Sequence, residues 1–176
     1  MDLDKKINDF LNKAKKIEKG NRLDLSSDED LSIGVMNLIS IEEHLFFSAG
    51  KTGKTKYYDL LNEIREMRKE LLKKLVKDYE GEVWCISKHL LAASMRLMEV
   101  GTKALTKGDK KEAYDLFKKS YDLYNLFWGL NLKIVDKKGM EDAFVSKEER
   151  PIPYEKKDML GKISGLIGKV LDCCRE

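Results

Sequence analysis

The sequence predicts an all-α protein, an antiparallel bundle of five to six helices with an irregular, proline-containing segment before the last helix. Apolar residues recur every three or four positions along most of the chain, which is the spacing of one helix face. Charged residues make up 37% of the 176 residues, and only two prolines occur. No stretch alternates apolar and polar residues in the manner of a strand. Long amphipathic helices are the structure that this combination favours.

One domain is expected for a chain of this length, which has enough residues to bury a hydrophobic core. Within it we expect a core bundle over 1–133, an irregular segment over 134–156 and a C-terminal helix over 157–174. The irregular segment contains both prolines, and each proline disfavours helix in the residue before it.

Charge and targeting signals limit the kinds of partner and the compartment. The chain has 34 basic and 31 acidic residues, for a net charge of +3. Such a small, scattered excess does not indicate a surface for nucleic acid or membranes. The N-terminus has no apolar secretory segment, and no run approaches the ~18 apolar residues of a membrane span. Because the three cysteines form no disulfide framework, we expect a cytoplasmic protein.

The first half of the chain predicts three helices. Residues 2–19 place apolar side chains at helical spacing. A second helix is predicted over 28–49, where Ser26 and Glu29 fit a capping box at its start. This helix is apolar on nearly every side, so we expect it to be buried on more than one face. A third, cleanly amphipathic helix is predicted over 56–79.

The second half of the chain predicts three more helices. The stretch 82–105 has two apolar faces, which predicts a central helix packed on two sides. A helix over 109–132 has an aromatic apolar side, and a last helix over about 157–173 has three glycines opposite its apolar side. Each interior glycine costs about 1 kcal/mol of helix stability, so the last helix should depend on docking to the bundle or to a partner.

Residues 94–127 carry small and apolar residues at positions typical of a repeat hairpin. These are Leu97, Gly101, Ala104, Gly108, Ala113, Phe117 and Ser120. The segment resembles a single tetratricopeptide-type helical hairpin, although Asn125 stands where that family usually has a proline and no second copy follows. The resemblance implies close antiparallel packing with small residues at the crossing. It implies no peptide-binding groove, which needs several repeats side by side.

Charged residues inside apolar stripes predict a polar layer across the middle of the bundle. Glu42 and Arg68 are such residues. If helices two to five alternate in direction, a rise of ~1.5 Å per residue brings Glu42, Arg65 and Arg96 to one height. Arg68 then lies about one turn away, and Tyr121 is near the same level. The predicted layer comprises Glu42, Arg65, Arg68, Arg96 and Tyr121.

Two interpretations of this layer are open. It can be a structural ion-pair network that fixes the register of the helices. It can also be an anion site, because several guanidiniums against one carboxylate leave positive charge for a carboxylate or phosphate ligand. Glu43 is a further possible member.

Cys85 and His89 form a second constellation, because residues four apart lie on one helix face and could hold zinc or iron. His44 lies roughly 13 Å away from His89 in height, which counts against a joint site. Neither histidine has the glutamate three residues earlier that ferritin-like di-iron proteins use. The alternative is a partly buried histidine with a hydrogen bond and a small core cysteine.

No catalytic motif is evident, so we expect a non-enzymatic helical interaction or adaptor protein that contacts a protein partner or itself. The expected contact surfaces are the aromatic side of 109–132 and the last helix. The alternative is a small-anion or metal-binding bundle with its site among helices two to four. No other cofactor is expected.

Overall fold

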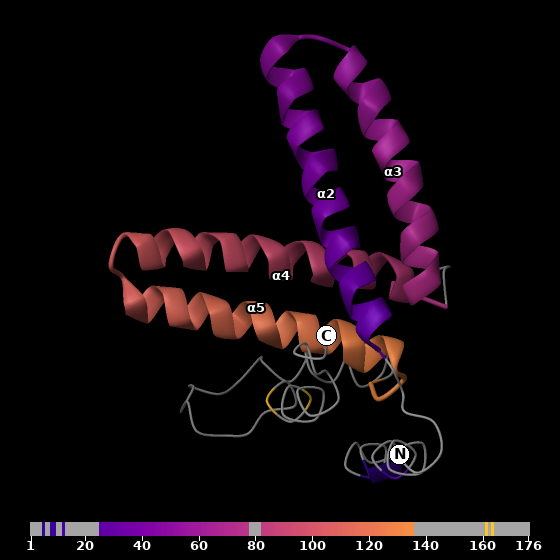
Figure 1. The fold of residues 1–176 in the computed structure, drawn as a ribbon, viewed down its shortest axis with the longest axis vertical. Helices are drawn as coiled ribbons and strands as arrows, with labels where there is room; N and C mark the ends of the chain where they lie inside the picture. The colour runs from indigo at the N-terminus through magenta and orange to yellow at the C-terminus, as the bar shows by residue number, and fades with distance from the viewer. Residues whose placement is uncertain are drawn as a thin grey trace, which may run out of the picture.

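The computed structural model describes residues 25–77 and 82–135, together with Lys5, Asn8, Asp9, Asn12, Gly161 and Ile163. The described part contains four helices and no strand (Figure 1). These helices are α2 (Ser26–Thr52), α3 (Lys56–Leu75), α4 (Glu82–Thr106) and α5 (Lys110–Asn131). The all-α class is therefore confirmed. Residues 136–156 of the irregular segment and most of the first and last predicted helices lie outside the described residues, so the count of five to six helices stays a prediction.

The helices form two antiparallel hairpins, α2–α3 and α4–α5, which cross each other instead of running parallel (Figure 1). Within each hairpin, the two helices pack along their length. Between the hairpins, α2 makes contact with α4 over a short stretch. The expected alternation of direction therefore holds within each hairpin, whereas the crossing changes which faces meet between them.

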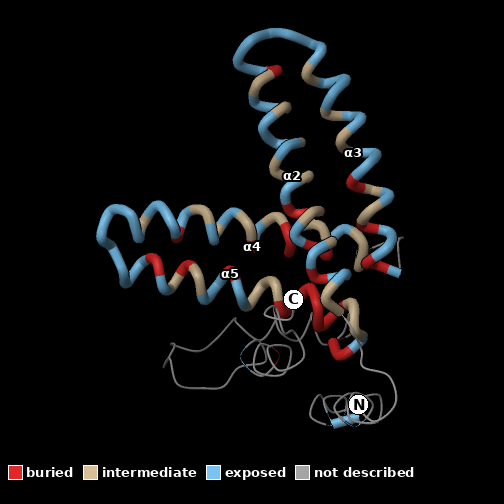
Figure 2. Tube along the Cα trace, viewed as in Figure 1, coloured by how far each residue is buried: buried red, intermediate tan, exposed pale blue. Residues whose placement is uncertain are grey.

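The hydrophobic core lies where the two hairpins meet, and both hairpins extend beyond it (Figure 2). It is built from the first half of α2, the end of α3, the first half of α4 and the end of α5. Its fully buried side chains include Val35, Leu72, Leu91, Leu126 and Phe127.

One polar link joins the two hairpins in this region. The Tyr124 hydroxyl of α5 lies 2.7 Å from the Ser32 hydroxyl of α2. Ser32 has a single proton, which it donates to the Glu29 carbonyl oxygen, so the Tyr124 hydroxyl is the donor to Ser32. Burial raises the pKa of the Tyr124 phenol.

The ends of α2 differ from the prediction. Leu25, not Ser26, is the N-cap residue, and the Glu29 amide donates to the Leu25 carbonyl oxygen at 2.8 Å. The predicted capping box at Ser26 is therefore wrong, since Ser26 already lies in the first turn. At the other end α2 continues to Thr52. Gly53 then adopts a left-handed conformation, with φ of 67°, and its amide donates to the Ala49 carbonyl oxygen.

Small residues allow α4 and α5 to approach closely. A Cβ added to Gly101 would lie 2.7 Å from Cε1 of Phe117, so only glycine leaves room for that ring. Ser94 and Ser120 are both buried, and each hydroxyl donates to the other residue's carbonyl oxygen, at 2.9 and 2.7 Å. The close packing that the repeat resemblance implies is thus present, while the resemblance itself stays a prediction.

Ile163 shows where the C-terminal part of the chain touches the core. Its side chain is fully buried, and a Cβ on Gly129 of α5 would lie 3.2 Å from its Cγ2 atom. Ile163 therefore packs into the hydrophobic core of the chain's own bundle. Among the described helices, none has the length and apolarity needed to cross a membrane.

Candidate interaction surface

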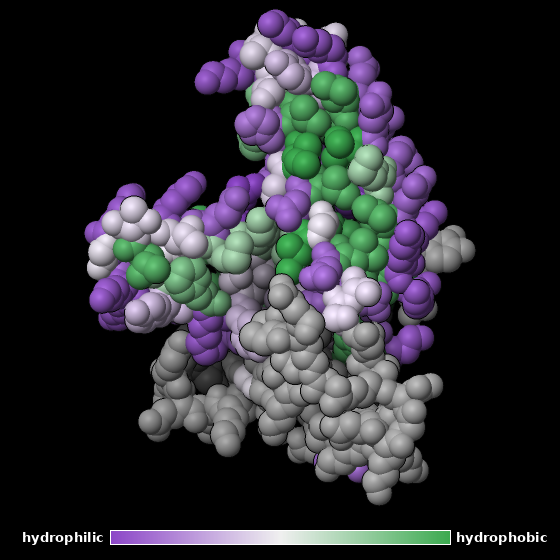
Figure 3. Space-filling view, viewed as in Figure 1, coloured by the Kyte–Doolittle hydropathy of each residue, from purple (hydrophilic) through white to green (hydrophobic). Residues whose placement is uncertain are grey.

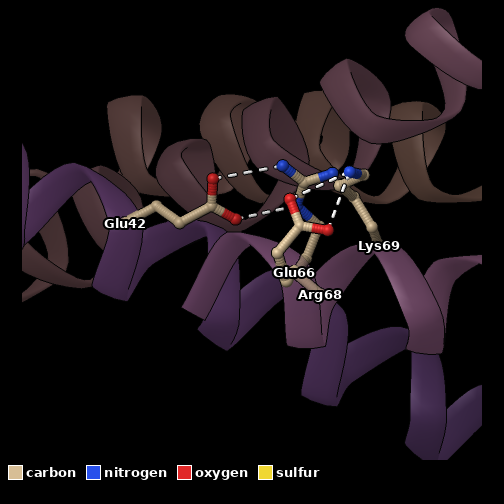
Figure 4. Close-up of polar contacts among 4 residues, drawn as sticks. All are labelled: Glu42, Glu66, Arg68 and Lys69. Atoms are coloured by element: carbon tan, nitrogen blue, oxygen red, sulfur yellow. Dashed lines mark hydrogen bonds and ion pairs between the residues drawn. The ribbon is translucent and has the colours of Figure 1, made fainter. Parts of the chain in front are cut away.

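The predicted pairing of Glu42 with Arg68 is present (Figure 4). Arg68 donates from Nε to Oε1 of Glu42 at 2.7 Å and from Nη2 to Oε2 at 3.1 Å. The Arg68 side chain is 4% exposed and that of Glu42 is 16% exposed. This two-pronged geometry satisfies both charges inside the apolar seam between α2 and α3.

Arg96 belongs to a different ion-pair group. It donates to Glu43 of α2 and, at 2.5 Å, to Glu99 of its own helix. The hydrogen bond to Glu43 is the main cause that raises the pKa of Arg96. Glu42 and Glu43 are neighbours in sequence, but their side chains point about 100° apart around a helix. Because α3 and α4 approach different faces of α2, the predicted single layer is divided into two groups.

Arg65 and Tyr121 do not join either group. Both side chains are exposed, Arg65 on α3 and Tyr121 on α5. Within 25–77 and 82–135, neither forms a hydrogen bond or ion pair with Glu42 or Arg68. Height along the bundle was predicted by counting residues, but which face a side chain occupies depends on the crossing of the hairpins.

The Cys85 and His89 pair lies at the surface of α4. The expectation that they are a core cysteine and a partly buried histidine is wrong, because both are exposed. His44 is exposed on α2. Among the described residues, no three histidine, cysteine or acidic side chains gather closely enough to hold a metal ion. The two α4 residues therefore have no third ligand in that part of the chain, and zinc or iron would need one from elsewhere.

The aromatic side of α5, expected as a contact surface, is divided between core and surface. Phe127 and Trp128 are buried, and Tyr124 is half-buried against them. Tyr114 and Tyr121 are exposed. The C-terminal part of α5, from Tyr124 on, therefore supplies packing, and the exposed rings lie before it.

Part of the α2–α3 hairpin, residues 37–71, extends beyond the core, and we call it the arm (Figure 1). Large apolar side chains are exposed along the arm. They are Ile41, Phe46, Phe47, Tyr58, Leu60 and Met67. The sequence interpretation placed α2 among helices on several sides, which would have buried these residues. The sequence did carry a signal for this exposure, because α2 is apolar on nearly every side. A two-helix arm cannot bury that much apolar surface.

One continuous apolar surface follows the seam of the arm (Figure 3). Figure 3 shows apolar side chains gathered between α2 and α3 on the viewed face, with hydrophilic ones along the outer edge of α3. Helical spacing of three and four assigns one row from each helix to this surface. We call it the strip, and it comprises Leu38, Ile41, Leu45, Leu60, Ile64, Met67 and Leu71.

An open cleft lies in the corner between α2 and α4. Its volume is about 600 Å³, and Ile41, His44 and Phe47 line it from α2. Arg96 and Glu99 line it from α4. The cleft adjoins the strip at Ile41 and Leu45, so the Glu43–Arg96–Glu99 group borders the apolar surface.

Comparison of the chain with family models, with curated proteins and with solved structures finds no match. Function is therefore inferred from the surfaces of the chain itself.

Proposed function

We propose that this chain is a helical interaction protein whose contact surface is the strip on the arm. The observation that carries the proposal is the exposure of three large apolar side chains of the strip, Ile41, Leu60 and Met67, on two helices that stand clear of the core. Contiguous apolar surface in a folded chain is typical of sites that bind proteins. Each Å² of apolar surface removed from water stabilises the complex by roughly 25 cal/mol. An apolar partner of complementary shape would therefore stay bound to the strip.

The Glu42–Arg68 pair makes the strip suitable for an apolar partner. Glu42 and Arg68 already satisfy each other's charge within the seam. A partner that covers the strip therefore removes no unpaired ion from water there. The pair also fixes the register of α2 against α3. A surface that is ordered before binding loses less conformational entropy when the partner arrives.

A partner helix is the shape that fits two parallel apolar rows. Rows spaced by three and four residues form a groove between the helices, and an amphipathic helix lays its apolar face into such a groove. The alternative small-anion or metal-binding function is not favoured by the contacts. Arg68 and Arg96 each already face a carboxylate, which leaves little unmatched positive charge.

Site-specific photo-cross-linking in cells tests the proposal. A photoreactive amino acid replaces Met67, which is 51% exposed on the strip, or in the control Tyr114, which is 60% exposed on α5. We expect a discrete cross-linked product from position 67 and none from position 114. Products of equal yield from both positions, or none from either, would contradict an interaction through the strip.

A further inference from the structure

We infer that the occupant of the strip is a second copy of this chain, with two arms packed strip to strip as a four-helix bundle. The inference rests on the proposed function and specifies its partner. A hairpin with one apolar face is half of such a bundle, in which every helix is covered by two neighbours. With a two-fold axis, the strip of one copy contacts the same strip of the other copy.

Charge at the tip of the arm favours this occupant. The last turn of α2 is basic at Lys51, and the first turn of α3 is acidic at Asp59. Because Glu42 contacts Arg68, Lys51 and Asp59 lie at nearly the same level of the arm. Packing α2 of one copy against α3 of the other therefore brings opposite charges to the same level at the tip of the strip.

The position of the second hairpin leaves the strip accessible. Arg96 of α4 reaches Glu43, which lies on a face of α2 about 160° from Ile41 by helical spacing. Figure 3 shows the strip uncovered by α4 and α5 on the viewed face. Two arms can therefore approach through their strips without displacing the second hairpin of either copy.

The Glu42–Arg68 pair also sets the register of the proposed dimer. Because Glu42 contacts Arg68, the neighbouring residues Ile41 and Met67 lie at nearly the same level of the arm. A two-fold axis parallel to the arm places α2 of one copy opposite α3 of the other. It therefore brings Ile41 of one copy against Met67 of the other.

Sedimentation velocity of the full chain over a range of concentrations tests this arrangement. We expect the unaltered chain to form a dimer. Ile41→Asp and Met67→Lys, each placing one charge on the strip, should each weaken the dimer about 30-fold or more. An equimolar mixture of the two variants should recover dimer, because aspartate and lysine then face each other across the axis. Tyr114→Asp, on α5, should dimerise like the unaltered chain.

Circular dichroism of each variant shows whether helix content is retained, and both altered side chains are about half exposed, so folding should survive. Should either variant lose helix, Leu60→Lys on the same strip takes its place. A monomeric unaltered chain that still gives a position-67 cross-link to another protein would overturn the self-association and leave the interaction function standing. Dimers that persist in the strip variants would overturn the self-association through the strip. A mixture of the two variants that stays monomeric would also overturn it.

Discussion

The two hairpins have similar helix lengths, 27 and 20 residues against 25 and 22, yet they are held together in different ways. The α4–α5 hairpin is held by small residues, with Gly101 admitting the Phe117 ring and Ser94 bonded to Ser120. The arm of α2–α3 is held by one buried ion pair and large side chains. Small residues let the backbones of α4 and α5 approach closely, whereas the large side chains of the arm form a strip that another molecule can cover.

The buried ion pair of the arm should show the largest single effect. Replacing Arg68 with methionine leaves the Glu42 carboxylate in an apolar seam without its partner. We expect the free energy of unfolding to fall by about 3 kcal/mol, as measured by urea denaturation. The double variant Glu42→Leu/Arg68→Met should recover most of that loss, because no isolated charge remains.

The exposed pair on the same helix is the matched control. Lys69 contacts Glu66 at 2.8 Å at the surface of α3 (Figure 4). Lys69→Met should leave the denaturation midpoint unchanged, because water screens an exposed pair. An Arg68→Met variant as stable as Lys69→Met would show that the pair does not hold the arm.

The glycine of the second hairpin should come next in size. Gly101→Ala places a methyl group against the Phe117 ring, and we expect a loss of about 1–3 kcal/mol in the free energy of unfolding. Gly50→Ala in α2 meets no atom within 4 Å and should stabilise the chain by about 0.5–1 kcal/mol. If both alanines stabilise the chain, close approach is not what distinguishes α4–α5 from the arm.

The Tyr124–Ser32 link between the hairpins should give a smaller effect than the loss of the Glu42–Arg68 ion pair. Tyr124→Phe removes the hydrogen bond to Ser32 and should lower the free energy of unfolding by about 1 kcal/mol at neutral pH.

This contribution should also depend on pH. Burial raises the pKa of Tyr124 above the ordinary value of 10.0. Below pH 10 both folded and unfolded states keep the phenol proton, so the contribution is constant. Above pH 10 the unfolded state ionises first, and stability falls as pH approaches the folded-state pKa. The difference between the unaltered chain and Tyr124→Phe should therefore narrow above pH 10 in denaturation curves. A difference that stays constant would contradict the pKa shift.

Periodicity predicted the helices well because the apolar face of each helix is determined by its own residues. The limits of α4 and α5 differ from the expected 82–105 and 109–132 by a single residue at any end. The pairing of Glu42 with Arg68 was predictable for a similar reason, since two opposite charges in adjoining apolar stripes must meet.

The remaining features depended on how the two hairpins cross. The residues of a single helix do not determine that crossing. Arg96 was expected beside Glu42 and contacts Glu43, because the crossing presents a different face of α2 to α4. The exposed strip was missed for the same reason. The apolar pattern of α2 indicates surface to be covered, but it does not say whether the cover is the same chain or another molecule.

Two methionines allow a direct test of the central claim that the strip is covered by a partner copy. Met67 on the strip is 51% exposed and Met98 on α4 is 43% exposed. Peptide mass spectrometry can follow their oxidation by excess hydrogen peroxide in the unaltered chain at low and high protein concentration. The rate at Met67 should fall as concentration rises, while the rate at Met98 stays constant. Rates at Met67 and Met98 that remain in the same ratio at every concentration would contradict the claim.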